Sequence, residues 1–119
     1  MMSVKGKVKG LERLHYAYVT KITVEVGKKE EVVFEIPDKI LDEINWSPSL
    51  NDRVEIEVSK EAGDTDAWNI VMMGEVYLKK EEEKKVIASM GGLQLSIISE
   101  KYYPEFKVGD KVYFKLKRI

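Results

Sequence analysis

Apolar and polar residues alternate along most of this chain, which is the pattern of β-strands that bury one face and expose the other. The run from Val19 to Val26 alternates in this way, and a second alternating run covers Glu31 to Ile36. Gly27-Lys28-Lys29 lies between the two runs and is typical of a turn that joins antiparallel strands. These residues predict a β-hairpin.

The first predicted strand extends from Ser3 to about Leu14 and contains Gly6 and Gly10. Glycine inside a strand marks a bulge or a tight bend. The segment therefore suits the curved wall of a barrel better than a flat sheet.

A short helix is predicted directly after the hairpin. Pro37 ends the strand, Asp38 can cap the helix, and Ser47-Pro48 stops it. The apolar positions of this helix fall on one side and are Ile40, Leu41 and Ile44.

Further strands are predicted after the helix. They cover residues 53–58 and, beyond a polar loop at 61–66, residues 68–79, 84–90, 93–99 and 110–118. Three strands, a short helix and two strands form the order of an OB-fold. We therefore expect an all-β fold, an antiparallel barrel built on an OB-fold-like element with one short helix. Since the chain has 119 residues, we expect a single domain over residues 1–119.

Residues 50–58 and 108–116 share a pattern. Each segment has an apolar residue, a turn pair ending in Asp (Asn51-Asp52 and Gly109-Asp110), a basic residue and an alternating strand. Asn and Gly both tolerate the positive φ that such a turn often needs. The pattern fits two barrel strands entered through the same turn chemistry, which we favour, or an internal duplication.

The carboxyl-terminal part, residues 68–119, contains an ordered set of three motifs. They are Val71-Met72-Met73-Gly74-Glu75-Val76-Tyr77, Met90-Gly91-Gly92-Leu93-Gln94-Leu95 and Val112-Tyr113-Phe114-Lys115-Leu116-Lys117. In this order they resemble subunit eight of DNA-directed RNA polymerase, whose archaeal form is called the G subunit. The resemblance implies an antiparallel barrel and an auxiliary subunit that docks on the largest polymerase subunit, away from the catalytic magnesium. It also implies that nucleotidyl transfer occurs elsewhere in the complex.

Composition narrows the classes of function. The chain has no cysteine and one histidine, so neither a disulfide nor a protein-built transition-metal site is expected, and we expect no cofactor. No apolar run is long enough to cross a membrane, and the amino terminus lacks a signal-peptide pattern, so a cytoplasmic protein is expected. The dominance of Lys and Glu among the charged residues is typical of thermophiles.

Charge is unevenly distributed along the chain. Residues 1–29 carry a net charge of +5, residues 30–66 carry −9, and residues 67–119 carry +3. Alternating charges on strands usually form a solvated face, and we favour that interpretation. The alternative is a basic surface where the two ends of the chain meet, which could contact nucleic acid or an acidic partner.

Groups that could carry catalysis are scarce. His15 is expected at a strand end beside Tyr16, where it has no neighbouring serine and aspartate of a triad. The Glu81-Glu82-Glu83 run is expected to be solvated at a hairpin tip. We therefore predict that the chain is not an enzyme by itself.

Binding is the remaining class of function. Gly91-Gly92 fits a two-residue hairpin turn and also a place where another backbone comes close. We predict that Gly91, Gly92 and Leu93, together with Met72 and Gly74, form the partner-binding site. Met72 and Met73 are expected on opposite faces of their strand, so only one can belong to the core.

Three functions are compatible with these observations. The first is a polymerase subunit that does not form homo-oligomers and contacts nucleic acid only weakly or indirectly. The second is a free-standing OB-fold module that binds single-stranded nucleic acid, for which the six tyrosines offer stacking platforms. The third is a small barrel enzyme or ligand carrier, which the scarcity of catalytic groups disfavours.

Overall fold

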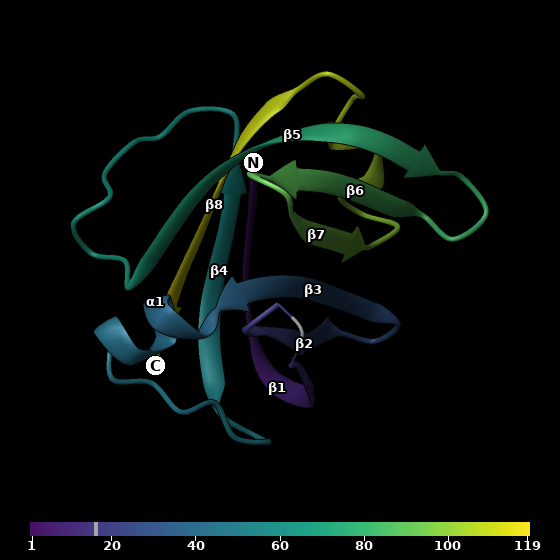
Figure 1. Cartoon of the computed structure of the whole chain (residues 1–119). Coiled ribbons are helices and arrows are strands. Elements are labelled where there is room, and N and C mark those ends of the chain that lie inside the picture. The colour runs from purple at the N-terminus through teal and green to yellow at the C-terminus, as the bar shows by residue number, and fades with distance from the viewer. Residues whose placement is uncertain (16) are drawn as a thin grey trace.

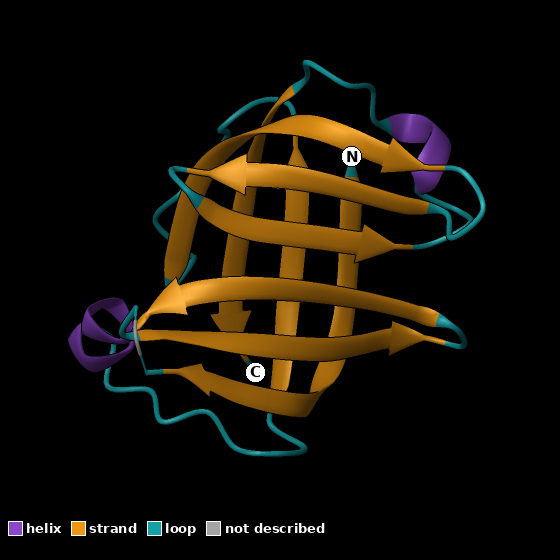
Figure 2. Cartoon of the chain, turned by 45° about the vertical axis from the view of Figure 1, so that its right-hand side comes forward, coloured by secondary structure: helices purple, strands orange, loops and turns teal. Residues whose placement is uncertain are grey.

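A computed structural model of the chain describes residues 1–15 and 17–119, so Tyr16 lies outside the described residues. Eight strands form a closed antiparallel barrel in the order β1-β2-β3-β7-β6-β5-β8-β4 (Figures 1 and 2). The elements are β1 (Met2–Leu14), β2 (Val19–Gly27), β3 (Glu30–Pro37), α1 (Asp38–Glu43), β4 (Arg53–Ser59), β5 (Ile70–Lys80), β6 (Lys85–Met90), β7 (Leu93–Ile98), the 3₁₀ helix η1 (Tyr103–Glu105) and β8 (Lys111–Arg118).

The predicted fold class is confirmed. The order β1-β2-β3-α1-β4, with β1 paired to both β2 and β4, is that of an OB-type element. The strands begin and end close to the predicted residues, and four further strands complete the barrel. The 3₁₀ helix η1 was not predicted, because its three residues are too few to show a helical period.

The predicted cap of α1 is wrong. Pro37 occupies the cap position, and no side chain caps the helix. Asp38 lies in the first turn, where its carboxylate accepts a hydrogen bond of 2.7 Å from the hydroxyl of Thr20 on β2. The helix is held by packing instead: Leu41 is buried, and the half-buried Ile40 and Ile44 contact the core as predicted.

The core fills the barrel with inward-facing side chains from every strand. Phe34 of β3 and Phe114 of β8 meet within it, with ring centroids 4.9 Å apart. Met72 packs against this core, whereas Met73 is 54% exposed, so the two methionines lie on opposite faces as predicted.

Two long strands, β1 and β5, exchange partners midway along their length. Lys7 of β1 pairs with Arg53 of β4 on one side and with Glu25 of β2 on the other. In β5, Glu75 pairs in the same way with Lys111 of β8 and with Ser89 of β6. Each strand therefore begins in one part of the barrel wall and ends in another, and Figure 1 shows the curved course of β5.

A glycine precedes each exchange because the strands approach too closely for a side chain. A Cβ on Gly6 would lie 2.2 Å from the carbonyl oxygen of Glu25, and one on Gly74 would lie 2.5 Å from that of Ser89. A bulge follows each exchange, at Lys9 in β1 and at Tyr77 in β5. The predicted bend and bulge in β1 are thus confirmed, and β5 repeats them.

The turns at Asn51-Asp52 and Gly109-Asp110, which precede β4 and β8, contact equivalent positions of β1 and β5. The amide of Asn51 donates to the carbonyl of Val8, and the amide of Gly109 donates to the carbonyl of Val76, at 2.7 and 2.8 Å. Both turn residues have positive φ, +76° for Asn51 and +98° for Gly109. The following aspartates accept from a backbone amide three residues earlier, Asp52 at 2.9 Å and Asp110 at 2.8 Å.

The chain therefore consists of an amino-terminal half (residues 2–59) and a carboxyl-terminal half (residues 70–118), each built as three strands, a short helix and a strand. The similarity between segments 50–58 and 108–116 extends beyond the turn to the paired strands, the glycines and the bulges. The halves join along two seams, β3 with β7 and β4 with β8. Two residues that occupy the same place in the two halves are called counterparts below.

Candidate partner-binding surface

The predicted turn at Gly91-Gly92 is confirmed. These two residues connect β6 to β7, and their φ values of +61° and +92° are those of a type I′ hairpin turn. A Cβ added to either glycine would meet no atom within 4 Å. The turn is therefore an open tip, and the next residue, Leu93, is half-buried against the core.

The other two residues of the predicted site face inward. Met72 packs against the core, and Gly74 lies against the backbone of Ser89 on β6. The packing of the barrel itself therefore explains why these two positions hold methionine and glycine. The structure brings Gly91, Gly92 and Leu93 together at the tip and places Met72 and Gly74 inside the barrel wall.

A weakly charged outer surface adjoins the tip, and we call it the carboxyl wall. It consists of the outward-facing residues of β5, β6 and β7, of which Ile87 and Ser96 are buried beneath their neighbours. The others are Val71, Met73, Glu75, Tyr77, Leu78, Lys80, Lys85, Ser89, Gln94 and Ile98. Val71, Met73, Tyr77 and Leu78 are exposed, each by at least 39%. Tyr77, Ser89 and Gln94 line a shallow depression together with Gly92 and Leu93 of the tip.

The sequence contained a signal for this wall. In β5, apolar residues occupy outward positions (Val71 and Met73) as well as inward ones (Ile70 and Met72). A strand with apolar residues on both faces indicates that both faces are covered, but the neighbouring strands had to be known before a surface could be assigned.

The outer surface on β1, β4 and β8, which adjoins the carboxyl wall where β8 pairs with β5, is charged. Glu55 of β4 lies between Lys5 of β1 and Lys117 of β8 in the strand register, and its carboxylate is 3.7 Å from the ammonium of Lys117. The neighbouring Glu57 is 3.2 Å from the ammonium of Lys115, which is only 2% exposed. The basic ends of the chain therefore flank an acidic strand and form ion pairs with it, and the solvated face favoured from the sequence does not include Lys115, which is buried.

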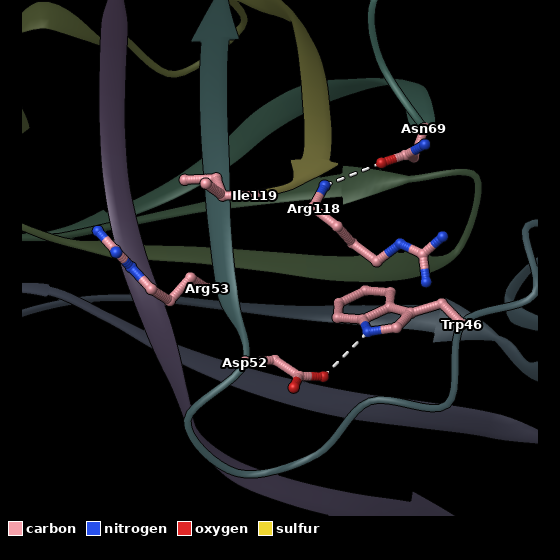
Figure 3. Close-up of a pocket in the computed structure, with 6 residues that line it drawn as sticks. All are labelled: Trp46, Asp52, Arg53, Asn69, Arg118 and Ile119. Carbon is pink, nitrogen blue, oxygen red and sulfur yellow. Dashed lines mark hydrogen bonds between the residues drawn. The ribbon is translucent and has the colours of Figure 1, made fainter.

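A polar pocket lies where the loop after α1 meets the end of β8 (Figure 3). The indole of Trp46 donates to the carboxylate of Asp52 at 3.1 Å, and the amide of Arg118 donates to the side-chain oxygen of Asn69 at 2.8 Å. The guanidinium of Arg118 donates to two backbone carbonyls at the end of α1. Figure 3 shows Arg53 on the other side of β4 from Arg118, so the two arginines do not converge on one anion.

The residues considered for catalysis lie on the surface. His15 is exposed in the turn after β1, and Glu81, Glu82 and Glu83 are exposed in the turn after β5. Glu81 accepts from the ammonium of Lys84 at 2.8 Å, a bond that lowers the pKa of the carboxyl and raises that of the amine. Within residues 1–15 and 17–119, the His, Asp and Glu side chains form no cluster of three that could hold a metal ion. The same residues include no helix of the length and apolarity needed to cross a membrane.

Fold and surface together define a closed all-β barrel in which part of the outer wall carries exposed apolar residues. The family model for the G subunit of DNA-directed RNA polymerase matches residues 1–119. The chain belongs to this polymerase subunit family, and so to the components of an enzyme complex.

Other comparisons add little. Among solved structures the chain is similar to the cytoplasmic molybdate-binding protein ModG with molybdate bound, at 13% identity and a TM-score of 0.40, over 98% of this chain and 89% of that one. A likeness this weak says nothing about ligands of the present chain. The search of curated proteins finds no match.

Proposed function

We propose that the chain is a non-catalytic auxiliary subunit of the multisubunit RNA polymerase. It docks on the largest subunit, supports assembly and stability of the complex during transcription, and works in the cytoplasm. The family match over residues 1–119 carries this proposal. The open tip at Gly91-Gly92 supports it, because another chain can approach the backbone there without meeting a side chain.

Assembly of the polymerase from its other subunits, with and without this chain, tests the proposal. The chain should co-elute with the complex and prolong RNA synthesis by the complex on heating, because binding stabilises the bound state. The isolated chain should make no RNA. Failure to co-elute, combined with tight binding of a single-stranded oligonucleotide at physiological salt, would favour the free-standing nucleic-acid module instead.

A matched pair of substitutions tests the tip, where we propose that Gly91, Gly92 and Leu93 contact the partner while Met72 and Gly74 support them from inside. Asn and Asp both tolerate positive φ and both fit the first position of a type I′ turn. Gly91→Asn and Gly91→Asp should therefore melt at nearly the same temperature. Only the aspartate places a charge in the contact, so it should weaken co-elution by about tenfold. Equal assembly of both variants would exclude the tip from the interface.

A further inference from the structure

The two halves place different chemistry on the same backbone position. Lys9, at the bulge of β1, reaches across β2, and its ammonium is 2.9 Å from the carboxylate of Glu31 on β3. This contact raises the pKa of Lys9. Its counterpart Tyr77 lies at the bulge of β5 and reaches across β6. The hydroxyl of Tyr77 accepts a 3.1 Å hydrogen bond from the side-chain amide of Gln94 on β7. An ion pair in one half is thus a neutral hydrogen bond in the other.

The same change recurs at other outward positions. The register pairs the charged residues Lys5, Glu25 and Glu35 with the uncharged counterparts Met73, Ser89 and Ile98, and it pairs the polar Ser3 with Val71. Inward counterparts remain apolar in both halves, as in Val8 with Val76, Ile22 with Val86, Val32 with Leu95, and Val54 with Val112. The loss of charge in the carboxyl-terminal half is therefore confined to its outside.

The barrel itself does not require this loss. The amino-terminal half shows that the same strand geometry accepts lysine at the counterparts of Met73 and Tyr77, and glutamate at those of Ser89, Gln94 and Ile98. A contiguous exposed apolar surface promotes association and is usually covered in the working protein. Interface cores are depleted in charge and enriched in Tyr and Met relative to the rest of the surface, and the exposed side chains of Met73 and Tyr77 are of this kind.

We infer that the carboxyl wall is the surface through which this chain binds another polymerase subunit, a partner with an apolar patch bordered by carboxylates. The inference rests on the proposed function and assigns it a surface. Acidic residues on the partner are indicated by the border of the wall, where Lys80, Lys85 and Lys111 lie. Glu75 is the acid within the wall, and it already pairs in register with Lys111.

Two other occupants fit less well. A second copy of the chain, docked about a twofold axis, would bring a basic border against a basic border and would be repelled. A nucleic-acid backbone needs a surface where cations gather, whereas the exposed apolar residues of β5 carry no charge and the charged residue between them is the acid Glu75.

The test exchanges the chemistry of the two halves. The double variant Tyr77→Lys with Gln94→Glu places a lysine and a glutamate on the carboxyl wall. They can form there the ion pair that Lys9 and Glu31 form in the amino-terminal half. The matched control, Lys9→Tyr with Glu31→Gln, installs the neutral pair on the other half. Both should fold, because each pair already exists on the equivalent backbone. We expect the first variant to bind polymerase lacking this subunit at least about tenfold more weakly than the unchanged chain, and the control to bind equally well.

A photo-crosslinking amino acid in place of Met73 identifies the occupant, with the counterpart Lys5 as control site. We expect a crosslink from position 73 to another polymerase subunit and none from position 5. The wall is not the interface if both double variants assemble normally, or if position 73 crosslinks to a second copy or to nucleic acid. If the unchanged chain itself fails to join the complex, the proposed function fails instead.

Discussion

The two halves of the barrel share a framework and differ in surface. Inside, both use apolar side chains of varied shape, a glycine at each partner exchange and a bulge after it. Outside, the amino-terminal half has the Lys9–Glu31 ion pair and Lys5 where the carboxyl-terminal half has the uncharged Tyr77, Gln94 and Met73. The difference shows that strand geometry in this fold is specified by inward residues and bends, which leaves the outer chemistry free to serve binding.

The strongest way to break this comparison is to fill the close approaches at the exchanges. Gly6→Ala and Gly74→Ala each place a Cβ within 2.5 Å of a backbone oxygen, so a strand must shift. We expect each variant to lose about 2–3 kcal/mol of unfolding free energy, measured by chemical denaturation. Gly10→Ala is the control, because its Cβ would meet Thr23 at 3.3 Å and its counterpart is Leu78. If Gly74→Ala proved as mild as the control, the bends would not be equivalent.

A second change tests the seam between β4 and β8. Glu57 and Lys115 occupy the same place in the two halves, and they also pair with each other across this seam. The ammonium of Lys115 is 3.2 Å from Glu57 and 3.1 Å from the carbonyl of Asp64. Lys115→Met leaves the Glu57 carboxylate without its cation, and we expect a loss of about 2 kcal/mol. Adding Glu57→Gln should restore part of the loss, because glutamine leaves no unpaired charge. A double variant less stable than the single one would show that the pair does not act through charge.

The smallest effect is expected at the shared turn and should depend on pH. The backbone amide of Lys107, and then Lys60 at 3.2 Å, hold the pKa of Asp110 below its ordinary value of 3.8. A lowered pKa means that the carboxylate stabilises the fold above pH 3.8 and that this contribution is lost as pH falls through the folded pKa. Asp110→Asn should therefore cost about 1 kcal/mol at neutral pH and almost nothing in strong acid.

The counterpart of Asp110 is Asp52, whose carboxylate accepts hydrogen bonds from the backbone amide of Ser49 and from the indole of Trp46. The loss of stability caused by Asp52→Asn, measured against the unchanged chain in thermal melts, should consequently depend less on salt than the loss caused by Asp110→Asn. Only the second substitution removes an ion pair, that of Asp110 with Lys60, which salt screens. Equal salt dependence would mean that Lys60 contributes nothing to the turn.

The sequence was sufficient for the strands, because period-two alternation reports local burial, and for the turn at Gly91-Gly92, where paired glycine specifies positive φ. It was insufficient for Asp38, whose hydrogen bond comes from Thr20 on another strand. The carboxyl wall also escaped prediction, since Met73 and Gln94 lie on strands that β6 separates. A strand pattern also does not tell which face closes the barrel, so it left open which of Met72 and Met73 packs inside.

The two seams have a consequence for how the chain emerges during synthesis. After residue 59 has left the ribosome, β3 and β4 are complete but β7 and β8, which flank them in the barrel, do not yet exist. Each seam takes one strand from each half, so the first half alone forms an open sheet with β3 and β4 at its edges. The nascent chain therefore exposes two open strand edges and the apolar face between them, the features that promote mispairing. Its most vulnerable interval lasts until residues 70–118 have been made.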